Sequence, residues 1–177
     1  MKWQFNSYQV FHRKEYYRIL THALIHGDFF HLFVNMLVLW SFGMVVEQGF
    51  TALFGAKGLI YFVVLYLGGI LVASLPGLAR HRDNPSYNAI GASGAVSAVL
   101  FSAIIWSPTS SIYLMFIPIP IPAFIFGPLY LAYEIYMDRR GGTRNAHDAH
   151  YWGAIYGIAF TLLAEPRLFG YFINEIF

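Results

Sequence analysis

The chain has 177 residues, of which 58% are hydrophobic, 19% aromatic and 11% charged. Soluble domains contain about a quarter charged residues, so this composition indicates a membrane protein. The net charge of +2 is too small to indicate nucleic-acid binding, and the absence of cysteine excludes disulfides and thiolate nucleophiles.

The first 28 residues are polar and aromatic and lack the apolar stretch of a signal peptide, so we expect a loop or interfacial segment over residues 1–28. Apolar runs follow, most of them close to or at the roughly 20 residues that a helix needs to cross a bilayer. Polar or Gly- and Pro-rich stretches separate these runs. The expected helices span about residues 29–46, 58–78, 89–106, 112–137 and 149–164. The sequence therefore predicts an all-α fold, a polytopic membrane helix bundle with five transmembrane helices in one domain over residues 1–177.

The fourth run begins with alternating isoleucine and proline, from Ile117 to Pro122. Proline has no backbone N–H to donate and favours an extended, polyproline-like conformation. Within this run we therefore expect the regular helix to begin near Ala123.

Polar side chains remain near the N-terminal ends of the first, third and fifth expected helices. His31 and Asn35 lie four residues apart and so share one helix face, while Ser93 begins the third helix and His150 the fifth. Consecutive spanning helices alternate in direction, so these three ends lie on one side of the membrane. Polar groups inside a membrane normally need a partner or a water-filled cavity, and their convergence therefore predicts a functional site.

The chemistry that these residues suggest is nucleophilic. A serine hydroxyl reacts once a neighbouring base takes its proton, and a neutral imidazole can do so near neutral pH. Ser93 and His150 can form such a dyad. The oxyanion that results needs hydrogen-bond donors, for which the Asn35 amide, the His31 imidazole and the backbone N–H of Ser93 are candidates.

Glycines accompany both members of the predicted dyad. Gly91 and Gly94 flank Ser93, and Gly153 and Gly157 follow His150 at i+3 and i+7, leaving a strip where the serine helix can approach closely. Taken alone, a Gly-x-Ser-Gly motif in a membrane helix is more often a packing seam than a nucleophile. The joint placement of the polar residues at one depth favours catalysis.

Three segments, "HGDFFHLFVNMLVLWSFG", "GASGA" and "HDAHYWGAIYG", together resemble the intramembrane serine proteases of the rhomboid family. A fourth, "FIPIPIPAFIFGPLYL", resembles the fifth helix of bacterial members. The resemblance implies that Ser93 is the nucleophile, His150 the base, and His31 and Asn35 oxyanion stabilisers. It also implies cleavage of transmembrane protein substrates within the lipid bilayer, without a cofactor, by a multi-pass protein of the bacterial inner membrane.

The resemblance further implies structural roles for Arg18, which stands in the place of a family Trp-Arg pair with Tyr17 replacing the tryptophan, and for Glu47, an acidic residue that closes the second family helix. Two departures from the family pattern are expected to matter. The chain is expected to lack the first of six family helices, and Phe101 stands where the family commonly has glycine.

Two arguments about membrane orientation disagree. Nine of the eleven Lys and Arg residues lie on the side that carries the predicted dyad, and the positive-inside rule places that side in the cytoplasm. The family resemblance implies that the same side faces outward, and we adopt that orientation as the expectation.

Other classes of site and function fit the sequence less well. No His-Glu-x-x-His motif occurs, and no carboxylate lies at familiar ligand spacing beside His147 and His150, so no metal site is expected. Asp148 lies two residues before His150 and points to another helix face, so a triad through it is not expected. The alternatives to a protease are a non-catalytic rhomboid-like protein that binds transmembrane clients and an inactive fragment.

Overall fold

The structure is a computed structural model that describes residues 2–114, 117–141 and 146–177. It is mostly helical, with one two-stranded antiparallel sheet. The helices are α1 (Ser7–Arg13), α2 (Arg18–Thr21), η1 (His22–Leu24), α3 (Phe29–Phe54), η2 (Gly55–Lys57), α4 (Gly58–Arg80), α5 (Ser93–Trp106), α6 (Ala123–Arg140), α7 (His147–Ala164) and α8 (Arg167–Ile176), and the strands are β1 (Ser111–Leu114) and β2 (Ile117–Pro122).

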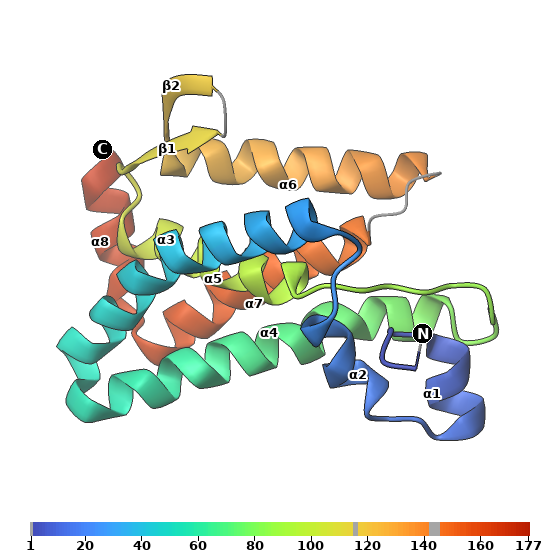
Figure 1. Cartoon of the computed structure of the whole chain (residues 1–177). Coiled ribbons are helices and arrows are strands. Elements are labelled where there is room, and N and C mark those ends of the chain that lie inside the picture. The colour runs from blue at the N-terminus through green and yellow to red at the C-terminus, as the bar shows by residue number, and fades with distance from the viewer. Residues whose placement is uncertain (1, 115–116, 142–145) are drawn as a thin grey trace.

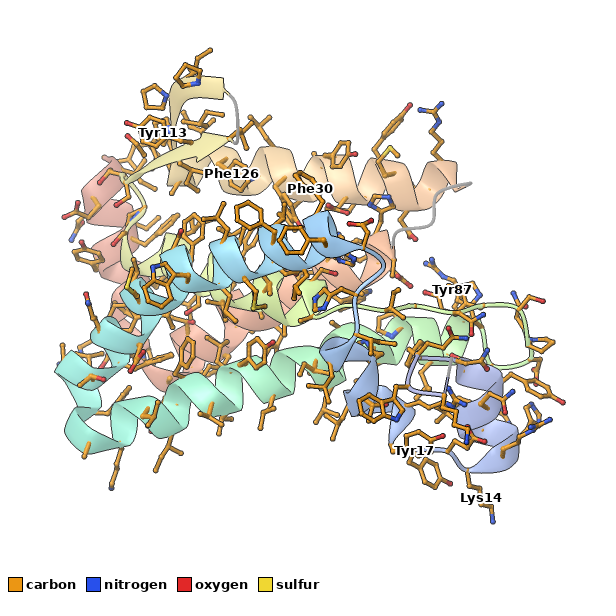
Figure 2. All side chains as sticks on the ribbon, in the orientation of Figure 1. Lys14, Tyr17, Phe30, Tyr87, Tyr113 and Phe126 are labelled. Carbon is orange, nitrogen blue, oxygen red and sulfur yellow. The ribbon has the colours of Figure 1, made fainter. Side chains whose placement is uncertain are left out.

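The N-terminal segment pairs with the chain just before α5. Phe5 and Ala89 exchange two backbone hydrogen bonds of 2.9 and 3.1 Å. The Asn6 side chain accepts from the N–H of Gln9, which caps α1, and donates to the carbonyl of Tyr87 at 3.0 Å. The segment therefore fixes the loop that leads into α5. Figure 2 shows Lys14 and Tyr17 at the outer edge of this segment, where both side chains are exposed.

The first long helix starts and ends at clear signals. The Asp28 carboxylate accepts from the N–H of His31 at 2.8 Å and so caps the start of α3. The helix continues to Phe54, beyond the expected end at residue 46, because no proline interrupts it, and it ends at Gly55, which adopts a φ of 58°. The run Phe29–Arg80, which comprises α3 and α4, is long and apolar enough to cross a membrane, whereas α5 is apolar but shorter. The number of spans stays a prediction.

Helix α5 forms the centre of the molecule. Every residue from Gly94 to Ile105 is buried, as expected for a helix that is apolar on all sides and packed among others. It contacts α3, α4, α6, α7 and α8. The helix begins at Ser93 and not at residue 89 because residues 89–91 are held outside it, by the pairing with Phe5 and by the φ of 108° at Gly91.

The bounds expected for the helix over residues 112–137 are wrong at their start, whereas the helix begins at Ala123, as the Ile-Pro run predicts. Strands β1 and β2 pair as an antiparallel hairpin, in which Ser111 pairs with Pro122 and Ile112 with Ile121. The prolines prevent a helix here, so α6 begins at Ala123. This hairpin also corrects the all-α fold class to a mostly helical one, and Figure 2 shows Tyr113 on it.

The three helices that carry the predicted site run in one direction. Figure 1 shows the first residues of α3, α5 and α7 at the same end of the molecule, with α4 and α6 running the opposite way. Their starting residues therefore meet at one end of the bundle.

Candidate active site

The structure brings Ser93 and His150 into direct contact. The Nε2 atom of His150 lies 2.7 Å from the Oγ atom of Ser93, a hydrogen-bond distance. Ser93 is the first residue of α5 and His150 lies in the first turn of α7, so the contact joins two helix N-termini. The His150 side chain is 16% exposed, which leaves the pair accessible from one side.

This contact is possible because α5 and α7 pack backbone against backbone. A Cβ atom on Gly153 would overlap the carbonyl oxygen of Gly94, and one on Gly157 would overlap the carbonyl oxygen of Ala98. On the opposite side, a Cβ on Gly94 would lie 2.5 Å from the Cβ of Ala73 in α4. Small residues therefore set the distance and the register between the two helices.

Phe101, where the family commonly has glycine, faces α6. A Cβ on Gly127 of α6 would lie 3.4 Å from the Phe101 ring, so the phenyl group fills the space that this glycine leaves. One turn before Phe101, at Ala98, α7 still approaches α5 backbone against backbone.

His31 lies against the loop that leads to Ser93. A Cβ on Gly91 would lie 2.7 Å from the Cε1 atom of the His31 ring, and the φ of 108° at this position itself favours glycine. The His26 ring contacts His31 edge-on, with 5.1 Å between the centroids. Gly91 thus leaves room for the His31 imidazole two residues before Ser93.

Asn35 is buried, with 4% of its surface exposed, and its Nδ2 atom donates to the carbonyl oxygen of His31 at 2.8 Å. This bond lies within α3. An amide nitrogen carries two hydrogens, so one of them stays available for another acceptor. The structure therefore places His31 beside the loop that leads to Ser93, whereas the hydrogen bond of the Asn35 side chain stays within α3.

Sequence reasoning missed one residue of the site, Glu134 of α6. Its Oε2 atom lies 2.5 Å from Nδ1 of His147 and 3.1 Å from Nδ1 of His150. Glu134 and His147 are each 4% exposed. The signal was a carboxylate within an apolar run, because ionisable residues inside a membrane generally have a function. Its partners follow only from how α6 and α7 pack.

These three side chains also have the separations of a metal site. The ligand atoms of Glu134, His147 and His150 lie within 4.8 Å of one another, so a carboxylate that the sequence spacing does not indicate lies beside the two histidines. The carboxylate comes from another helix. The positive end of the α7 dipole lies at His147 and favours an anion over a cation there. We therefore interpret the group as a carboxylate shared by two imidazoles.

Asp148 does not face His150. Its Oδ1 atom accepts from the N–H of Ala149, and its Oδ2 atom lies 3.8 Å from the Arg80 guanidinium. Arg80 also forms a 2.8 Å ion pair with Asp138 of α6. The acidic residue that lies next to His150 in space is therefore Glu134. Asp148, which is close to His150 in sequence, interacts with Arg80 instead.

The two proposed support residues differ in their surroundings. Arg18 is 8% exposed, and its guanidinium donates to the Glu15 carboxylate at 2.5 Å and to the carbonyl of Gln4 at 2.9 Å. Glu47 is exposed on α3, and within the described residues it has no hydrogen-bond or ion-pair partner. Arg18 thus holds the N-terminal segment together, whereas the structure gives Glu47 no such contact.

A small cavity of about 30 Å³ lies beside Ser93, and its lining includes His22, Ser74 and Ser93. The Nε2 atom of His22 is 3.1 Å from the Oγ atom of Ser74. Burial lowers the pKa of the His22 imidazole below its ordinary value. The other lining residues are mostly apolar, so His22, Ser74 and Ser93 supply the polar side chains of this cavity.

The fold and the site define a mostly helical membrane protein with a serine–histidine pair where two helices begin. Residues 13–167 match the Rhomboid domain family, and the chain belongs to that family.

Its relatives include mitochondrial proteins from several kingdoms. The chain is 30% identical to RHOMBOID-like protein 12, mitochondrial, of Arabidopsis thaliana over 165 residues, which are 84% of this chain and 47% of the relative. It is 34% identical to Rhomboid protein 1, mitochondrial, of Saccharomyces cerevisiae (67% of this chain, 34% of the relative). It is 31% identical to the human Presenilin-associated rhomboid-like protein, mitochondrial (79% of this chain, 36% of the relative). The chain thus spans less than half the length of each of these relatives.

Proposed function

We propose that this protein is an intramembrane serine endopeptidase that cleaves transmembrane segments of membrane-protein substrates. The observation that carries the proposal is the 2.7 Å contact between His150 Nε2 and Ser93 Oγ. The rhomboid family, to which the chain belongs, includes proteases of this kind. The site lies among apolar helices, so a substrate that reaches it would itself be membrane-embedded. The resemblance of residues 116–131 to bacterial members is the basis for a bacterial cell membrane, although the relatives named above are mitochondrial.

The reaction follows from the atoms in place. His150 Nε2 takes the hydroxyl proton of Ser93 as Oγ attacks the carbonyl carbon of the scissile peptide, and the carbonyl oxygen becomes an oxyanion. The C–N bond then breaks, and the proton on Nε2 passes to the leaving amine. A water molecule next gives a proton to Nε2 as its oxygen attacks the ester carbon. The ester C–Oγ bond then breaks, the proton on Nε2 passes to Ser93 Oγ, and the new carboxyl end is released.

The developing oxyanion requires donors near the attacked carbon. The backbone N–H of Ser93 opens a helix, where N–H groups have no partner within the helix and the dipole favours negative charge. We assign the His31 imidazole and the second hydrogen of the Asn35 amide as further donors. Gly91 supports this arrangement because it admits the His31 ring beside the loop.

Covalent labelling tests the nucleophile. We expect a fluorophosphonate probe to label the detergent-solubilised protein and to give no labelling with Ser93→Ala or His150→Ala. Ser97→Ala is the matched control, since Ser97 lies one turn along α5 and its hydroxyl contacts the Tyr130 hydroxyl at 3.1 Å. Labelling that persists in folded Ser93→Ala protein would contradict the proposal.

A further inference from the structure

We propose that Glu134 is a positioning residue that holds His150 in the tautomer able to accept the proton of Ser93. The inference rests on the proposed function and adds a third group to it. His150 lies between two side chains, with Ser93 Oγ 2.7 Å from Nε2 and Glu134 Oε2 3.1 Å from Nδ1. The three residues come from α5, α6 and α7, so the acid is provided by a helix that carries neither member of the dyad.

The tautomer matters because a neutral imidazole carries one ring proton. If that proton is on Nε2, the ring can only donate to Ser93 and has no lone pair there to act as a base. If it is on Nδ1, Nε2 is a base. A carboxylate beside Nδ1 favours the second tautomer and stabilises the imidazolium that forms when Ser93 loses its proton.

The surroundings of Glu134 keep its carboxylate in this position. The group is buried, and a buried charge requires hydrogen bonds or an opposite charge. His147 contacts the same Oε2 atom through its Nδ1 at 2.5 Å, which orients the carboxylate, and the positive end of the α7 dipole lies at His147. His147 therefore supports Glu134, and Glu134 in turn faces His150.

Glu134 Oε2 and His150 Nδ1 are close enough for an ion pair, but in the structure without substrate their geometry is not that of a hydrogen bond. Hydrogen bonds in catalytic sites are often long or poorly aligned without substrate and shorten as charge develops. A small rotation of the carboxylate would align the two groups. The rings of His147 and His31 also lie near His150, but an imidazole cannot replace the carboxylate that faces Nδ1.

A second carboxylate on α6 serves as a control that separates a purely structural role of Glu134 from a role in positioning His150. Asp138 lies four residues later on the same face of α6 and ties that helix to Arg80 of α4 at 2.8 Å, without contact to the dyad. Loss of either carboxylate weakens the attachment of α6. Only the loss of Glu134 removes the acid from His150.

The experiment compares Glu134→Gln, Glu134→Asp and Asp138→Asn with the wild-type protein in detergent. We expect Glu134→Gln to lower the fluorophosphonate labelling rate and kcat on the order of a hundred- to ten-thousandfold with little change in KM, as for loss of an acid that sets the tautomer of a general base. Glu134→Asp restores part of the rate because it keeps the charge, and Asp138→Asn keeps most of it. An unchanged rate in Glu134→Gln, or an equal loss in Asp138→Asn, would overturn the inference.

Nitrogen NMR of 15N-histidine-labelled protein, with the His150 signals assigned from His150→Gln, gives a readout that does not depend on activity. We expect the proton of neutral His150 on Nδ1 in the wild-type protein and a shift toward Nε2 in Glu134→Gln. The same tautomer in both proteins would overturn the role of Glu134 even if neither protein cleaves substrate. Absent labelling of wild-type Ser93 together with the expected tautomer change would instead count against the proposed protease activity alone.

Discussion

Gly153 of α7 faces the carbonyl oxygen of Gly94 of α5 so closely that no side chain fits between them. Each glycine is a near neighbour of a dyad residue, since Ser93 directly precedes Gly94 and His150 comes three residues before Gly153. The backbone contact between the helices therefore determines whether the imidazole reaches the hydroxyl.

Replacement of Gly153 by alanine tests this dependence. We expect Gly153→Ala to destabilise the fold by about 1–3 kcal/mol, as overpacking does, and to reduce Ser93 labelling because α7 moves away from α5. Thermal unfolding in detergent and the labelling rate measure the two effects. Gly170→Ala is the control, since a Cβ at position 170 of α8 meets no atom within 4 Å. Equal behaviour of the two variants would contradict the packing argument.

Asn35→Ala tests the assigned oxyanion donor. We expect kcat to fall on the order of ten- to thousandfold with KM little changed, because one donor to the transition state is lost. Steady-state kinetics on a single-span test substrate measure both constants. An effect confined to KM would assign Asn35 to substrate binding, and no effect would leave its bond to His31 as its only role.

His22 provides a pH-dependent contribution to stability. Because burial holds the pKa of folded His22 below its ordinary value of 6.5, the unfolded chain binds more protons between these two pKa values. Stability is therefore greatest above pH 6.5 and falls as the pH drops from there through the folded pKa. We expect His22→Gln to show a smaller decrease in unfolding temperature than the wild-type protein between about pH 7.5 and about pH 5. Identical decreases would show that other groups cause the pH dependence.

Arg18 holds the N-terminal segment together through its bonds to the Glu15 carboxylate and the Gln4 carbonyl. We expect Arg18→Lys to destabilise the fold by about 1–3 kcal/mol, because an ammonium cannot reproduce two separate guanidinium bonds in a buried place. Thermal unfolding in detergent measures the change. Arg82→Lys, at an exposed position stacked on Phe11, is the control and is expected to change stability little. A similar loss in both variants would contradict the role of Arg18.

The sequence predicted those features of the fold that depend on short, local sequence signals. The Ile-Pro repeats place the start of α6 at Ala123, and the alternation of helix directions explains why Ser93 and His150 lie at one end of the bundle. Other features depend on how distant segments pack. The pairing of Phe5 with Ala89 joins segments far apart in the chain, and no periodicity indicates it.

Glu134 illustrates the same limit within the site. Its position in an apolar run is a signal that the sequence analysis did not use, and the choice among several histidines depends on the rotation of α6 about its axis and on its packing against α7. A shift of one residue turns a helical side chain by about 100°, so small errors in a predicted boundary change which groups meet. The contact with His150 therefore required the three-dimensional structure.

The central claim is that Ser93 and His150 together hydrolyse a peptide bond within the membrane. The most direct test reconstitutes the purified protein in liposomes with a single-span substrate and identifies the products by mass spectrometry. We predict cleavage within the transmembrane segment by the wild-type protein and by Ser97→Ala, and none by folded Ser93→Ala or His150→Ala, since the members of a catalytic pair act as a unit. Wild-type-like cleavage by either dyad variant, or intact substrate with the folded wild-type protein, would contradict the account.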